Sequence, residues 1–211
     1  MKKHTFTEAI FLLYRGKLPT IGERTLLDAM LVSAVEHGIE VPSLFVPRIC
    51  VASGNSVHVG IAAGILAIGE AHGGAGEAAA EILISRESAE TIVAECARSR
   101  KRIPGFGHRV YKNEDPRARV IFEKAQEAGV TLDAFQKAYE IEKELERVKG
   151  KKLPLNIDGA FAAGVLALQM EPVTAKVLFV LARVVGMGAH AIEEIKQGNG
   201  YARLDKSEIS E

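Results

Sequence analysis

Apolar residues recur at helical spacing along almost the whole chain, and the apolar-polar alternation of strands is nearly absent. Thr5 with Glu8, and Thr20 with Glu23, have the spacing of capping boxes, and each pair precedes an apolar helical face. The 211 residues suffice for one large domain, or for a core with a smaller inserted lobe. The sequence therefore predicts an all-α fold.

Composition excludes several classes of partner. Lys plus Arg and Asp plus Glu number 27 each, so no global field attracts nucleic acid or an anionic membrane. The longest apolar run, near Val177 to Ala189, is interrupted by Arg183 and is too short to span a bilayer. We expect no nucleic-acid partner and no membrane, and any cationic site must be local.

The cysteines and the N-terminal segment indicate the cellular compartment. Cys50 and Cys96 lie in apolar helical sequence and match no metal-ligand spacing, which favours buried free thiols in a reducing compartment. Residues 1–16 contain a short apolar run but resume helical polarity and lack a small-residue cleavage site. We therefore expect no signal peptide and a cytoplasmic protein.

The densest chemistry lies in residues 105–117, which read GFGHRVYKNEDPR. Gly105 and Gly107 allow the backbone to approach a ligand closely, and His108 adds a polar group beside them. The cations of the segment are Arg109, Lys112 and Arg117. This pattern predicts a binding site for a small anionic molecule.

A helix start follows within the same segment. Asp115 has the character of an N-cap and Pro116 that of the first helical residue, which places Arg117 in the first turn. The helix macrodipole does not favour a cation there. Arg117 therefore needs an anion, and a carboxylate ligand would suffice.

Three other polar residues stand at the ends of apolar helices. Asp158 precedes a helix of Ala, Val, Leu and Phe, where it is either a plain N-cap or a functional acid. His37 follows a helix and either complements the macrodipole or contacts a ligand. His72 stands beside two glycines at the edge of a core, and a structural helix end explains only the first of them.

Burial is expected for two further features. Residues Ser56 to Glu70 are so poor in charge that we expect this helix to be buried on most sides, with His58 as a core histidine. Arg183 is the only charge between Lys176 and Glu193, and a buried arginine needs an anion.

Residues 105–117 resemble the signature of the citrate synthase family: glycine, aromatic, glycine, histidine, a basic residue, then Asp-Pro-Arg. Residues 61–83 and 153–168, the EHG of 36–38 and the helix around Arg183 also resemble that family, in its order. The family's long N-terminal part is absent. The chain is therefore most similar to the short citryl-CoA lyases and to the C-terminal lyase domain of ATP-citrate lyase.

The resemblance implies a citrate synthase-like multi-helical fold. It implies a large helical domain of residues 1–72 and 160–211, and a smaller inserted lobe of residues 73–159 that holds coenzyme A and closes over the site. It also implies a twofold homodimer, or an assembly of dimers, with a C-terminal arginine donated to the neighbouring site.

The resemblance also implies the site residues. The catalytic set is His72, His108 and Asp158; the substrate-binding set is His37, Arg117, Arg183 and, as a looser match, Arg203; the coenzyme A contacts are Ile103, Pro104, Gly105, Phe106 and Gly107. The residues offer no metal spacing and no nucleotide-binding loop. We expect no metal and no permanently bound cofactor, with a coenzyme A thioester as substrate.

The favoured function is that of a citryl-CoA lyase, which interconverts citryl-CoA with acetyl-CoA and oxaloacetate. A compact citrate or 2-methylcitrate synthase, which also hydrolyses the thioester, is the first alternative. A non-catalytic citrate-binding or scaffolding member is the second, although His72, His108 and Asp158 are all present. A separate citryl-CoA synthetase as partner is compatible with the sequence.

Overall fold

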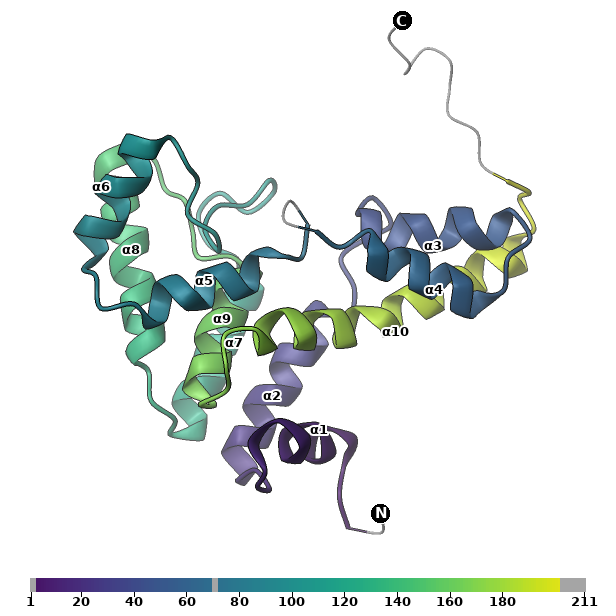
Figure 1. The fold of residues 1–211 in the computed structure, drawn as a ribbon, viewed down its shortest axis with the longest axis horizontal. Coiled ribbons are helices and arrows are strands. Elements are labelled where there is room, and N and C mark those ends of the chain that lie inside the picture. The colour runs from purple at the N-terminus through teal and green to yellow at the C-terminus, as the bar shows by residue number, and fades with distance from the viewer. Residues whose placement is uncertain (1–2, 70–71, 202–211) are drawn as a thin grey trace, which may run out of the picture. The chain divides into compact units, whose positions relative to one another are not determined.

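The computed structural model describes residues 3–69 and 72–201. These residues form ten helices and no strand, apart from two isolated bridges between Gly69 and His72 and between Phe106 and Leu155 (Figure 1). The helices are α1 (Phe6–Arg15), α2 (Ile21–Ala34), α3 (Pro42–Ala52), α4 (Val57–Leu66), α5 (Ala75–Ile84), α6 (Ala89–Ser99), α7 (Pro116–Ala128), α8 (Asp133–Lys149), α9 (Ile157–Ala167) and α10 (Thr174–Gln197). The predicted all-α fold is confirmed.

The chain divides into two compact units. Unit 1 comprises Met1–Ala34 and Gly73–Phe179, and unit 2 comprises Val35–His72 and Val180–Glu211. Helix α10 therefore begins in unit 1 and continues in unit 2. The expected inserted lobe also starts at Gly73 but ends at residue 159, and the division into a large domain and a closing lobe stays a prediction.

Helix α9 is the centre of unit 1. It contacts α2, α5, α7 and α8, and nearly all its residues are buried. Small residues permit these close approaches: a Cβ on Gly164 would lie 2.7 Å from the sulfur of Met30 in α2. The apolar sequence after Asp158 thus forms a helix that other helices surround, because it has no polar face to present to water.

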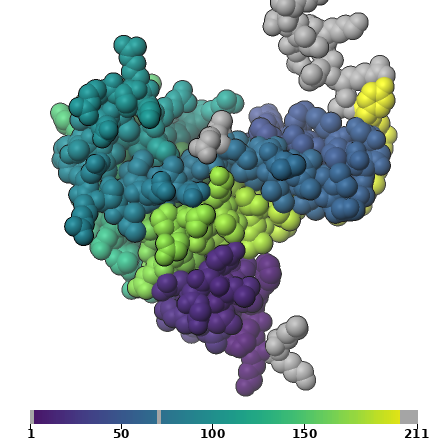
Figure 2. Space-filling view, viewed as in Figure 1, coloured from purple at the N-terminus to yellow at the C-terminus, as the bar shows by residue number. Residues whose placement is uncertain are grey.

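The N-terminal helices of unit 1 begin as the sequence predicts. Thr5 accepts a hydrogen bond from the backbone of Glu8, whose carboxylate accepts one from the backbone of Thr5. Thr20 and Glu23 repeat this arrangement before α2. Both capping boxes are confirmed, and α1 lies at the surface of its unit, in purple in Figure 2.

In unit 2, α3 packs against α4. The two glycines of α4 face this contact, and a Cβ on Gly64 would lie 2.6 Å from a ring carbon of Pro47. Much of the rest of α4 is open to solvent: Leu66 is 86 % exposed and His58 is exposed as well. The expectations of a helix buried on most sides and of a core His58 are wrong, because only the small-residue face is packed.

Helix α10 is longer than the apolar run suggested. Its 24 residues and their hydropathy would by themselves suffice for a membrane span, and 44 % of its most apolar window is buried inside the protein. The expectation that this segment is too short to span a bilayer is therefore wrong on length.

Cys50 and Cys96 are free thiols but are only half-buried, because each sits on a partly open helix face.

Candidate active site

His108 lies in the loop between α6 and α7 of unit 1, and its neighbours determine its tautomer. Its Nδ1 accepts hydrogen bonds from the backbone N–H of Val110 and of Tyr111, both at 3.1 Å. The Tyr111 ring stacks on the imidazole with centroids 4.8 Å apart. Because Nδ1 is an acceptor, the hydrogen of the neutral ring lies on Nε2.

The charge state of His108 follows from its surroundings. Burial lowers the pKa of the imidazole, and the nearby Arg117 and Lys112 lower it further, against the opposing effect of Asp115. The ring is therefore neutral near pH 7. A neutral imidazole with Nε2–H is a hydrogen-bond donor for a carbonyl or hydroxyl oxygen.

Arg117 is held by the cap of its own helix. Asp115 is the N-cap of α7 and Pro116 its first residue, as predicted, and the Asp115 carboxylate accepts from Arg117 Nε at 3.0 Å and from its terminal nitrogen at 2.7 Å. The buried Asp115 therefore has a lowered pKa, since the bonds from Arg117 outweigh its burial. The anion that stabilises Arg117 in the first turn is thus Asp115, and an external carboxylate is not required for that purpose.

Arg117 nevertheless lies beside His108. Its terminal nitrogen is 3.4 Å from His108 Nε2, and its guanidinium carbon is 5.6 Å from the centre of the Tyr111 ring. With Nδ1 of His108 occupied as an acceptor, the two facing groups are both donors. The arrangement presents two donors side by side, which suits a shared oxygen acceptor.

The turn at Gly105 to Gly107 is joined to the start of α9. Gly107 N–H donates to the Pro154 carbonyl at 2.8 Å, and Asn156 donates to both glycines, from its backbone to the Gly105 carbonyl and from its side chain to the Gly107 carbonyl. Gly105 has φ +87°, and a Cβ on it would lie 2.8 Å from the Cα of Gly159. Only glycine fits this crossing.

The contact between Gly105 and Gly159 places the neighbouring Asp158 next to the turn. The N-cap of α9 is Asn156, whose side chain accepts from the backbone N–H of Asp158 and of Gly159. The interpretation of Asp158 as a plain N-cap is therefore wrong. Asp158 is the second helical residue and half-buried, where the macrodipole favours its negative charge.

A cationic pocket of about 640 Å³ opens beside the same turn. Ile103, Phe106, Gly107 and His108 form part of its wall, together with apolar residues of α6 and α8. Among the described residues that line it there are seven cations and no acid. These cations are Arg100, Lys101, Arg102, Arg109, Lys112, Lys149 and Lys151. The pocket suits a large anionic molecule with an apolar portion.

Unit 2 contains a second polar cluster, around His72. Its Nε2 lies 2.8 Å from the hydroxyl of Ser43, and Arg183 donates to the same hydroxyl at 3.4 Å. A guanidinium only donates, so Ser43 accepts from Arg183, and because the Ser43 backbone N–H makes His72 Nε2 an acceptor, the Ser43 hydroxyl donates to that nitrogen. The Ser43 N–H also faces Nε2, at 3.4 Å. The relay leaves the ring hydrogen of His72 on Nδ1.

His72 is a neutral donor like His108. Burial lowers the pKa of its imidazole, and Arg183 and His37 lower it further, so His37 lies within electrostatic reach of His72. Arg183 is 2 % exposed, which confirms the expected burial of this cation. His37 itself lies in the loop after α2, beyond the last helical turn.

The predicted site residues thus form two groups. Unit 1 brings together His108, Arg117, Asp158 and the turn of residues 103–107, and unit 2 brings together His37, His72 and Arg183. Arg203 lies outside the described residues.

Sequence reasoning missed Ser43 and Asn156. Asn156 carried a recognisable signal, since asparagine is a preferred N-cap. Ser43 carried none.

The sequence model of the family described as "Citrate synthase, C-terminal domain" matches residues 1–204. The chain belongs to the citrate synthase family. "Citrate synthase 2" of Bacillus subtilis is 32 % identical over 185 residues, which are 85 % of this chain and 49 % of that protein. The chain therefore spans about half the length of this curated relative of the citrate synthase family.

Solved structures of the citrate synthase family and its lyase relatives have the same fold. Citryl-CoA lyase from Hydrogenobacter thermophilus aligns with a TM-score of 0.91 and 40 % identity, over 99 % of this chain and 84 % of that one. ATP citrate lyase from Methanothrix soehngenii, solved with citrate and coenzyme A, aligns with a TM-score of 0.91 and 22 % identity, over 100 % of this chain and 37 % of that one. The predicted resemblance and the citrate synthase-like fold are confirmed.

Proposed function

We propose that this protein is a citryl-CoA lyase, which cleaves citryl-CoA to acetyl-CoA and oxaloacetate and catalyses the reverse condensation. The observation that carries the proposal is the cationic pocket lined in part by His108, which suits a coenzyme A thioester delivered to a neutral imidazole. The 40 % identity to a citryl-CoA lyase over nearly the whole chain supports the lyase over the synthase.

Coenzyme A suits this pocket by charge and by shape. The cofactor carries phosphates at its nucleotide end and a long, largely uncharged arm that ends in sulfur. The phosphates pair with lysines and arginines of the pocket, and the arm runs along the part of its wall that Ile103, Phe106 and Gly107 form. The thioester is a substrate here and not a resident cofactor.

The oxaloacetate or citryl carboxylates are assigned to Arg117 and Arg183, with His37 as a further contact. Both guanidiniums are shielded from solvent, and planar guanidiniums bind carboxylates with two parallel hydrogen bonds. Asp115 orients Arg117 from one edge, and Ser43 contacts Arg183. Each arginine is thus pre-oriented before substrate binds.

The family resemblance assigns the steps of condensation to these residues as follows. The Asp158 carboxylate removes a proton from the methyl carbon of acetyl-CoA, and His72 Nδ1–H donates to the enolate oxygen that forms. The enolate carbon attacks the ketone of oxaloacetate. The ketone oxygen takes up negative charge beside the donors of His108 and Arg117 and receives the Nε2 proton of His108, which the ring regains from solvent. The same steps in reverse cleave citryl-CoA, with Asp158 returning the proton to carbon.

A compact citrate or 2-methylcitrate synthase is the alternative, because citrate synthases are among the relatives. Incubation of the purified chain with citryl-CoA separates the two. A lyase releases oxaloacetate, which malate dehydrogenase and NADH report at 340 nm, whereas a synthase releases free citrate and coenzyme A. Accumulation of citrate would replace the proposed lyase with the synthase, and neither product would favour a non-catalytic member.

We also propose a homodimer in the cytoplasm. Exposed apolar residues occur on α4 and on the unit 2 part of α10, namely Leu66, Val185, Ile192 and Ile195. Large exposed apolar patches are uncommon on soluble monomers. A second copy is the occupant that the family resemblance suggests, and Arg203 is the candidate for donation in trans. A citryl-CoA synthetase remains a candidate source of substrate.

A further inference from the structure

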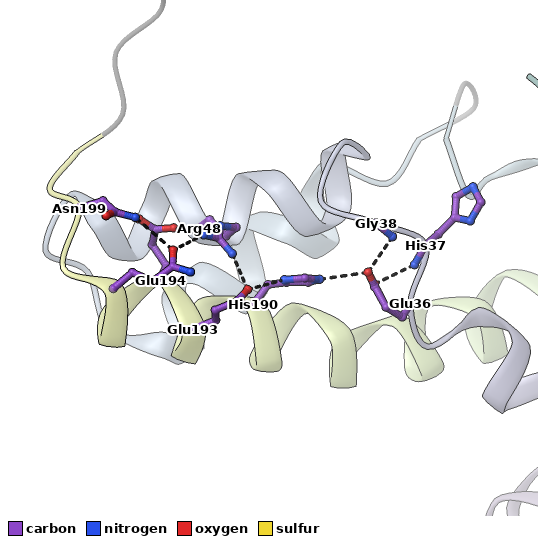
Figure 3. A network of polar contacts seen from close by, with 9 residues as sticks. Glu36, His37, Gly38, Arg48, His190, Glu193, Glu194 and Asn199 are labelled. Carbon is purple, nitrogen blue, oxygen red and sulfur yellow. Dashed lines mark hydrogen bonds and ion pairs between the residues drawn. The ribbon is translucent and has the colours of Figure 1, made fainter. Parts of the chain in front are cut away.

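The loop between α2 and α3 in unit 2 is held from one side by Glu36. The Glu36 carboxylate accepts from the backbone N–H of His37 at 2.8 Å and from that of Gly38 at 2.7 Å (Figure 3). Gly38 has φ +82°, so the chain turns here through the left-handed region. The direction in which the His37 side chain leaves the backbone therefore depends on where Glu36 is held.

His190 of α10 holds Glu36. His190 Nε2 lies 3.1 Å from a Glu36 oxygen, and its Nδ1 lies 3.2 Å from an oxygen of Glu193. Glu193 in turn accepts from Arg48 of α3 at 2.6 Å. The imidazole is thus fixed between two carboxylates, of which one belongs to the loop and the other is tied to α3.

Both carboxylates are ionised acceptors. The bonds from His190 and then from Arg48 lower the pKa of Glu193, and for Glu36 the bond from His190 and those from the loop backbone lower the pKa despite the opposing effect of burial. An ionised carboxylate only accepts, so the imidazole of His190 is the hydrogen-bond donor between the two carboxylates. Charge-assisted bonds of this kind are about twice as strong as neutral ones.

His37 faces the other way. In Figure 3 its imidazole points away from Glu36 and His190, although its backbone N–H is bonded to Glu36. His37 lies within electrostatic reach of His72, whose pKa it lowers. The His37 side chain is therefore turned away from the ion network that binds its backbone.

We propose that His190 is a positioning residue, which clamps Glu36 and thereby fixes the backbone of His37 and Gly38 so that the His37 imidazole is presented to the dicarboxylate. The second half of this statement rests on the proposed function. His190 itself touches no substrate, and Arg48 and Glu193 hold it in place from α3 and α10.

Amide hydrogen exchange on the full chain tests the clamp without reference to activity. In His190→Leu, which removes both ring nitrogens at similar volume, the His37 and Gly38 amides should exchange about 10-fold faster, equivalent to about 1.4 kcal/mol. His190→Gln, which retains one donor, should restore part of the protection. His58→Leu, at an exposed histidine of the same unit, is the matched control and should change nothing at this loop.

The second readout is oxaloacetate affinity by calorimetry, with Tm measured in parallel. His190→Leu and Glu36→Gln should each weaken binding about 10-fold, and the double variant should be no weaker than the worse single one because both act through one contact. Unchanged exchange in His190→Leu overturns the clamp. Faster exchange with unchanged affinity overturns the positioning of His37. A parent chain that binds no oxaloacetate overturns the proposed function, and the exchange data still decide the clamp.

Discussion

Replacing Ser43 with alanine tests the relay in unit 2 at a single oxygen atom. The Ser43 hydroxyl is fully buried, receives a hydrogen bond from Arg183 and lies 2.8 Å from His72 Nε2. Ser43→Ala removes the donor that keeps the ring hydrogen of His72 on Nδ1, and it leaves a buried nitrogen without this partner. The substitution changes only how the His72 and Arg183 side chains are oriented, since both residues remain.

The expected magnitude follows from the cost of the lost bond. Leaving a buried polar group unsatisfied costs about 1–3 kcal/mol, and about 1.4 kcal/mol equals a factor of ten in rate. If that cost falls on the enolate-forming step, kcat should drop about 10- to 100-fold. KM for the thioester should change little, because the cationic pocket lies in unit 1 and Ser43 is no part of its lining.

The assay is steady-state cleavage of citryl-CoA with coupled detection of oxaloacetate, accompanied by a thermal melt. Ser53→Ala is the matched control: Ser53 is the exposed C-cap of the same helix, and its hydroxyl donates only to the Ile49 carbonyl. The control should retain full kcat. If Ser43→Ala lowers kcat less than about twofold while the control behaves as expected, the relay from Arg183 to His72 has no role in the reaction.

Four further results are expected. Asp158→Asn should lower kcat at least about 100-fold while oxaloacetate binding persists, and a loss of only a few-fold would make Asp158 a structural acid. Arg183→Leu should weaken dicarboxylate binding by calorimetry, and an unchanged affinity would remove it from the site. Burial first, and neighbouring arginines second, lower the pKa of His72 and His108. Activity and stability should therefore hold down to about pH 6.5 and fall as pH drops further through the folded values, since the unfolded chain then binds more protons; a fall in kcat/KM or Tm that begins above pH 7 would contradict this. Leu66→Glu should shift a dimer toward the 22.7 kDa monomer in light scattering, and a parent chain that is monomeric at full activity would refute the dimer.

Local interactions are the part of this protein that its sequence determines by itself. The capping box of Thr5, and the Asp115 cap with Pro116 behind it, involve residues at most three positions apart, so the pattern alone specifies where α1 and α7 begin. The glycines at 105 and 107 predicted a close approach of the backbone to a ligand, and at Gly105 the structure shows a close approach to Gly159. Residue types and short spacings sufficed because the physical causes are themselves short-ranged.

Only the tertiary structure decided which partners these residues have. Ser43 is 29 positions from His72 and 140 from Arg183, so no spacing rule links them. Arg117 called for an anion, yet the sequence did not show that Asp115 itself bends back to bind it. The apolar residues of α4 were predicted to be buried, but burial depends on which other elements of the chain pack against each face of the helix. The chain covers the face that carries Gly60 and Gly64 and leaves Leu66 exposed, because side-chain burial is a property of packing and not of composition.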